Sequence, residues 1–393
     1  MKYGDVEEKV MRKFLYLNLI LILFLLENCG PKQDKTDERS SGYPVHMTYI
    51  DGVKTVLNPD IPRDGRIKYQ MGDVITLGEE GGPEEGILYF PGKIQVDSKG
   101  NIYVFDAEDY TIKVYDDKGH WIRNIGRRGQ GPGEYMNMTD FDVSLDGRIF
   151  ICDIRQRRIS FLNSDGTFDS SFLMKGPCDR LELDETGQLY LQQNFVFKQT
   201  STSGSRQWEW FIIRTDPKGK NPFEYGKFLG TKIVWRPRQT EQGLWVNSHI
   251  SRDSHTTVWI VDKQERLYLG YSQDYLISVL DKKGKPLFKF GRDFTPIKHP
   301  LYSPNLAHPE YYPAFYSRHL FFDDEGNLWL KQYIESDETG HLYDVFSPDG
   351  IFIQQAEVSE RIIRYQNGKV YTIVETSSGD HVAKCYKLIQ YTH

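Results

Sequence analysis

Apolar and polar residues alternate in short runs through most of the chain, and these runs recur in groups of four. The clearest group predicts four strands, at 93–97, 101–106, 111–115 and 121–126. Gly100 and Gly119 stand in its two tight turns, where glycine allows a positive φ without a Cβ clash. Alternation with a period of two is typical of β-strands, so this stretch predicts one four-stranded antiparallel sheet.

The same order of runs returns five more times along the chain. These copies centre on 148–153, 188–191, 266–269, 327–330 and 370–374. A sandwich has no reason to repeat its turns in register, whereas a ring of equivalent sheets does. We therefore predict an all-β fold, a six-bladed β-propeller of four-stranded antiparallel blades. A seven-bladed ring or another antiparallel β array is the alternative.

The sixth copy lacks a fourth strand, because the chain ends after its third. The run 73–78 is similar to the fourth strand of the first copy, 121–126, and both precede a Gly-Pro loop. A strand from the N-terminal side would complete the last blade and remove its exposed edge. The sequence therefore predicts a ring closed by 73–78.

Strand order predicts that the long connections share one face of the ring. Turns inside the hairpins are short, whereas five other connections are long: 79–90, 127–137, 194–207, 227–255 and 292–317. Antiparallel strand order puts all five at the same end of the blades. Loops displayed by a rigid scaffold commonly carry binding residues, so this long-loop face is the predicted binding surface.

The long connections are rich in aromatic and basic residues. Aromatic rings held by nearby prolines can stack on sugars, peptides or flat ligands, and paired arginines can bind an anion. The candidate binding residues are Arg127, Arg128, Gln130, Glu134, Tyr135, Trp235, Arg236, Trp245, Tyr311, Tyr312 and Phe315. The alternative interpretation is structural: the rings would cap the core and the arginines would form surface ion pairs.

The N-terminus carries features of an exported protein. Arg12 and Lys13 precede the apolar run 14–26, which has signal-peptide length and is short for a membrane span. Leu26-Glu-Asn-Cys29 resembles a bacterial lipobox, which implies lipidation of Cys29. Acidic residues before Met11 predict that translation starts there. We expect a signal peptide over 1–29, a tether and N-terminal extension over 30–65, and the propeller over 66–393.

The charge of the chain bears on its possible partners, and its cysteine content bears on possible disulfides. The net charge is −6, with 49 basic and 55 acidic residues mixed along the chain, so no nucleic-acid partner is expected. Besides Cys29 there are three cysteines, which we interpret as buried thiols. Cys152 and Cys178 are the one pair close enough in the predicted blades to form a disulfide.

The segment 126–135, Gly-Arg-Arg-Gly-Gln-Gly-Pro-Gly-Glu-Tyr, carries a family resemblance. It resembles the six-bladed β-propeller lipoproteins of Bacteroidetes-type bacteria, relatives of NHL-repeat proteins. The resemblance covers about 73–391 and implies a monomeric propeller in the cell envelope, anchored as an outer-membrane lipoprotein and facing the periplasm or the surface. It supplies no catalytic residues.

Two functions are compatible with these features. The first is a lipid-anchored module that binds a glycan, peptide or envelope protein through the long-loop face, with no cofactor. The second is a lactonase- or lyase-like enzyme that uses a divalent metal at the channel entrance. His249, His255, His299, His308 and His319 fall in or beside two long connections, although surface histidines would give the same pattern.

Overall fold

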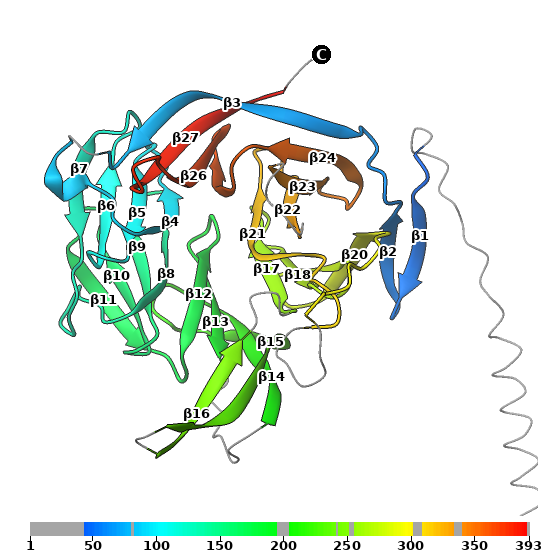
Figure 1. Cartoon of the computed structure of the whole chain (residues 1–393), viewed down its shortest axis with the longest axis horizontal. Coiled ribbons are helices and arrows are strands. Elements are labelled where there is room, and N and C mark those ends of the chain that lie inside the picture. Colours follow the sequence, from blue (N-terminus) through cyan, green and yellow to red (C-terminus); the bar gives the residue numbers. More distant parts are fainter. Residues whose placement is uncertain are drawn as a thin grey trace, which may run out of the picture.

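The structure is a computed structural model that describes residues 43–79, 82–194, 204–240, 243–250, 255–301, 309–333 and 340–390. It confirms the predicted fold: antiparallel sheets stand around a central axis as the six blades of a β-propeller (Figure 1). Six apolar clusters each join two neighbouring blades, so the ring is closed. No helix in these ranges is long and apolar enough to cross a membrane.

Blades 1 and 2 have the predicted four strands. Blade 1 consists of β4 (Pro91–Val96), β5 (Ile102–Asp106), β6 (Thr111–Tyr115) and β7 (Trp121–Ile125). Blade 2 consists of β8 (Met138–Val143), β9 (Ile149–Asp153), β10 (Arg158–Leu162) and β11 (Phe168–Leu173). The innermost strands, β4 and β8, lie near the axis (Figure 1).

In blades 1, 3, 4 and 5, an aspartate side chain holds the turn between the first two strands by accepting hydrogen bonds from two backbone amides. Asp97 Oδ1 accepts hydrogen bonds from the amides of Lys99 and Asn101, both at 2.9 Å, and Gly100 follows with a φ of 86°. Asp184, Asp262 and Asp323 repeat these bonds in blades 3, 4 and 5. The carboxylates therefore hold the turns in shape, which explains why Asp-x-x-Gly recurs along the chain.

Blade 3 has five strands instead of the predicted four. They are β12 (Cys178–Leu183), β13 (Leu189–Asn194), β14 (Gly204–Thr215), β15 (Phe223–Thr240) and β16 (Gly243–Ile250). The expectation of a long loop over 227–255 is therefore corrected, because β15 continues into a hairpin with β16.

Blade 4 is extended by residues for which the sequence predicted no strand. Its own strands are β17 (Thr257–Val261), β18 (Leu267–Tyr271), β19 (Leu276–Leu280) and β20 (Pro286–Arg292). The hairpin of β1 (His46–Ile50) and β2 (Val53–Asn58) covers the outer edge, with β2 parallel to β20. Asn58 fixes this contact, because its amide donates to the carbonyls of Gly291 at 2.8 Å and Gly350 at 2.9 Å.

Blades 5 and 6 share one N-terminal strand. Blade 5 contains β21 (Phe315–Phe322), β22 (Leu328–Gln332), β23 (His341–Phe346) and β24 (Phe352–Val358). Blade 6 contains β25 (Ile362–Gln366), β26 (Lys369–Glu375), β27 (His381–Gln390) and β3 (Arg66–Leu77). The predicted closing strand is confirmed: Leu77 pairs with Ala383 and Ile75 with Cys385. The start of β3 also pairs in parallel with β24, so β3 arches across both blades (Figure 1).

Candidate binding site

A cavity of about 880 Å³ follows the axis of the ring. Its wall includes residues in, or directly before, the innermost strands of all six blades, among them Gly92, Thr139, Arg180, Thr256, Leu320 and Arg361. These strands begin at the long-loop face. Leu145 and Lys263 line the cavity at the opposite end, where the short turns lie. The volume is within the range of small-molecule sites.

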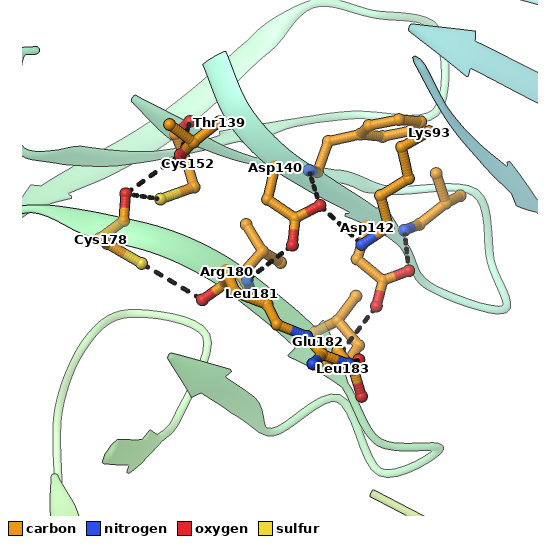
Figure 2. Close-up of polar contacts among 12 residues, drawn as sticks. Lys93, Thr139, Asp140, Asp142, Cys152, Cys178, Arg180, Leu181, Glu182 and Leu183 are labelled. Atoms are coloured by element: carbon orange, nitrogen blue, oxygen red, sulfur yellow. Dashed lines mark hydrogen bonds and ion pairs between the residues drawn. The ribbon is translucent and has the colours of Figure 1, made fainter. Parts of the chain in front are cut away.

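Two carboxylates of β8 connect blade 2 to blade 3 along this wall (Figure 2). Asp140 accepts from the Leu181 amide at 2.9 Å, and Asp142 accepts from the Leu183 amide at 2.8 Å. Asp140 also pairs with Lys93 of blade 1 at 2.7 Å. The two amides lie on the inner edge of β12, and β12 is the edge strand of its sheet, so no strand pairs with them there. The side chains of β8 therefore satisfy backbone groups that would otherwise face the cavity.

Asp142 has an unusual electrostatic environment. Burial raises the pKa of its carboxyl, while the nearby charges of Lys93 and Arg364 oppose this effect by favouring the anion. Arg180 and Glu182, on the neighbouring strand β12, form an ion pair (Figure 2). Lys93 with Asp140 and Arg180 with Glu182 are thus ion pairs on this part of the wall.

The wall between blades 3 and 4 combines indole rings with amides and hydroxyls. The Arg180 guanidinium lies over the Trp259 ring, 4.5 Å from its centre, and the Trp259 indole donates to Gln192 Oε1 at 2.7 Å. Asn194, Trp210 and other polar residues line the cavity nearby.

The loop 127–134 uses most of its polar groups internally. Glu134 accepts from Arg127 Nε at 2.7 Å and from the Gly131 amide at 2.9 Å, and the second bond holds the pKa of Glu134 below its usual range. Arg158 donates to the carbonyls of Gly131 and Glu134. The motif that carries the family resemblance therefore builds a defined loop between blades 1 and 2.

The other predicted residues of this loop divide into exposed and buried. Arg127 and Gln130 are exposed, and Arg128 lies over the ring of Tyr110 at 4.8 Å. Tyr135 is only 1% exposed, so the prediction that it contacts a ligand is corrected. Its ring packs into the core between blades 1 and 2 and leaves no room for a side chain at position 126: a Cβ on Gly126 would lie 2.4 Å from the ring.

The proline-rich connection before β21 also contains both exposed and buried aromatic rings. Tyr311 is 40% exposed. Tyr312 lies between His299 and Tyr333, with 4.3 Å between ring centres on each side. Phe315 is fully buried against blade 4, so its predicted ligand contact is corrected: the first residue of β21 faces the core.

Several predicted residues lie outside the described parts of the structure. Trp235, Arg236 and Trp245 have described backbone in β15 and β16, but their side chains lie outside the description. Cys29 lies outside the described residues altogether, as does His308. The side chains of His249 and His319 are likewise outside the description.

The remaining histidines and cysteines near the site are buried or half-buried. Burial lowers the pKa of His255, and His299 is 2% exposed. Within the described ranges, no group of three or more His, Cys, Asp or Glu residues could hold a metal ion. Cys152 and Cys178 are free thiols; Cys152 donates to the carbonyl of Cys178 at 2.9 Å (Figure 2), and burial raises the pKa of the Cys178 thiol.

Sequence reasoning placed the binding residues in the long loops and missed the innermost strands. A signal was present in β8, where Asp140 and Asp142 interrupt an otherwise apolar strand at alternate positions. Two polar side chains on the same face of a buried strand indicate either a partner in the protein or a polar cavity. Here they have both.

Comparison with known proteins agrees with the architecture. Residues 86–244 match the family DUF5128, described as a six-bladed β-propeller. A Bacteroides fragilis protein described as a candidate exported protein has a similar structure: it is 11% identical, with a TM-score of 0.53, over 84% of this chain and 99% of its own. A Bacteroides vulgatus member of the DUF4221 family is 10% identical, with a TM-score of 0.53, over 83% and 99%. No curated protein matches the chain. At these identities the likeness shows the fold alone, a six-bladed β-propeller.

Proposed function

We propose that this protein is an exported, lipid-anchored β-propeller that binds a glycan, a peptide or an envelope protein at the long-loop end of its central cavity. The observation that carries the proposal is the cavity of about 880 Å³, whose wall draws polar and charged side chains from the innermost strands. A β-propeller arranges its blades around a central channel, and here polar and charged side chains line that channel, where a ligand can contact them. The signal-peptide pattern and the lipobox ending at Cys29 support export and anchoring.

A bulky substitution at each end of the cavity tests the binding face. Gly92 begins the wall at the long-loop end and is exposed, and a Cβ added there would meet only Phe105, at 3.7 Å or more, so Gly92→Trp introduces no clash at Cβ. Leu145→Trp is the matched control at the other end, where Leu145 is 48% exposed. The ligand is first found as a rise in melting temperature of the full chain, in mild detergent, against neutral oligosaccharides, acidic oligosaccharides and short peptides.

We expect Gly92→Trp to weaken binding of the active compound by at least about tenfold, roughly 1.4 kcal/mol, while Leu145→Trp leaves it unchanged. Isothermal titration calorimetry of the three proteins measures this difference. Equal affinity of both variants would place the site away from the long-loop end. A panel in which no compound raises the melting temperature would contradict the binding function.

A further inference from the structure

Two arginines of blade 6 line the central cavity without an acidic partner. Arg361 directly precedes β25 and is exposed, and Arg364 lies within β25 and is half-buried. Arg364 Nη2 donates to Gln366 Oε1, a neutral acceptor, at 2.9 Å. Within the described residues, neither arginine forms an ion pair with a carboxylate. Each guanidinium therefore keeps N–H donors, set in a planar fork that matches a carboxylate, for a group that enters the cavity.

The other basic residues that line the described part of the wall are paired. Their ion pairs are Lys93–Asp140, Arg180–Glu182 and Lys263–Glu185. At the short-turn end, the carboxylates of Asp184, Asp262 and Asp323 accept hydrogen bonds from the amides of their own turns. The positive charges of Arg361 and Arg364 are thus the ones on this wall that no ion pair of the described residues offsets.

A β-bulge sets the direction of Arg364. The register between β25 and β26 shifts between Ile362 and Arg364, so β25 holds one extra residue there. Arg364 stands opposite Tyr371, whose ring packs in the cluster between blades 6 and 1. Directly opposed residues share a face of the sheet, so Arg364 lies on the side of blade 1. Bulges often direct a side chain toward a functional site, and here the bulge falls on an innermost strand.

The charges nearby favour a ligand group with a single negative charge. Arg364 and Lys93 both act on Asp142 of blade 2, where they oppose the rise in pKa caused by burial. The cations of blades 6 and 1 therefore act on one region of the channel. Asp142 would repel a doubly charged phosphate more strongly than it would repel a carboxylate.

We infer that Arg361 and Arg364 form a subsite for the carboxylate groups of an acidic ligand. The inference rests on the proposed binding function and names its ligand class. Three residues of strand span at most about 10 Å, so each arginine can hold one carboxylate of a short oligomer that enters from the long-loop end. Hydrogen bonds from guanidinium to carboxylate are roughly twice as strong as those between neutral groups. An oligosaccharide of uronic acids and an acidic peptide both supply this chemistry.

The test uses the full chain in mild detergent with two carboxylate probes, a galacturonate tetramer and a tetraglutamate peptide. The fully methyl-esterified galacturonate tetramer is the matched neutral probe. We expect wild type to bind one of the carboxylate probes, and the probe that binds tells whether the source is a sugar or a peptide. Arg361→Gln and Arg364→Gln should each weaken this binding about tenfold in isothermal titration calorimetry. If the sugar binds, its methyl ester should bind wild type at least about tenfold more weakly.

Salt and a third arginine separate a binding role from a structural one. Wild-type affinity should fall as NaCl rises from about 20 to about 300 mM, and less steeply in both arginine variants. Arg155→Gln is the matched control: Arg155 follows β9, is exposed and does not line the cavity. This variant makes the same change of charge and should keep wild-type affinity.

The other outcomes distinguish this inference from the proposed function. A carboxylate probe that binds wild type and both arginine variants equally overturns the subsite and leaves the binding module intact. Binding of neutral compounds alone does the same. Failure of neutral, acidic and peptide compounds to bind at all overturns both proposals. Melting temperatures show whether the variants fold; if Arg364→Gln does not, Arg361→Gln, at an exposed position, decides alone.

Discussion

At the scale of single residues, the innermost strands carry the chemistry. Asp140 and Asp142 satisfy two backbone amides at the free edge of β12. Of the residues predicted from the long loops, Tyr135 and Phe315 are core residues, whereas Arg127, Arg128, Gln130 and Tyr311 remain at the surface. A side chain's role in a loop thus depends on which neighbouring blade it faces, and the residue type does not specify that.

The raised pKa of Asp142 predicts a pH dependence of stability. Asp142 binds its proton more tightly in the folded protein than in the unfolded chain, where the pKa is about 4. Its contribution is therefore complete below about pH 4 and is lost as the pH rises through the higher folded value. We expect wild type to lose stability relative to Asp142→Asn as the pH rises from about 4 toward neutrality, measured by urea unfolding at stepped pH. Parallel curves would contradict the raised pKa.

At the scale of elements, β3 closes the ring and buries its last residue. Leu77 is fully buried in the cluster between blades 6 and 1, next to Leu88 and Ala383. The closing strand could be predicted because 73–78 resembles 121–126 in the sequence. Its parallel pairing with β24 could not, since nothing in residues 66–68 specifies which edge they meet.

Shortening a buried side chain in the closing strand should lower the free energy of unfolding much more than shortening an exposed one in an outer strand. We expect Leu77→Ala to lower the free energy of unfolding by about 2–5 kcal/mol, because it leaves a cavity between two blades. Leu173→Ala, in the outer strand of blade 2 with a side chain that is 76% exposed, should stay within about 0.5 kcal/mol of wild type. Denaturant unfolding followed by tryptophan fluorescence measures both. Similar losses for the two variants would refute closure by β3.

At the scale of the whole molecule, the ring is asymmetric in a way that bears on function. Blade 3 is enlarged by the β15–β16 hairpin, which projects from the ring, and blade 4 is extended by β1 and β2 (Figure 1). The described chain begins at the outer edge of blade 4, so the predicted tether would connect the ring to the membrane from that side.

The proposed lipid anchor makes a prediction for the intact protein in cells. Cys29→Ala removes the only atom to which the lipid could be attached, so the protein should move from the membrane fraction to the soluble fraction. Ser41→Ala, in the predicted tether, is the matched control and should stay with the membranes. Fractionation of a bacterium that processes lipoproteins, followed by immunoblotting, measures the distribution. Continued membrane association of Cys29→Ala would exclude lipidation at this residue.

The repeated architecture could be predicted because its causes are local. Alternating side chains specify strands, and Asp-x-x-Gly turns specify hairpins such as 97–101. The closing strand followed from the same pattern. The cavity could not be predicted, because its wall is assembled from residues of six blades that are far apart in the chain. Which side chains face that cavity depends on how neighbouring blades pack against each other, and that packing exists only once the ring has closed.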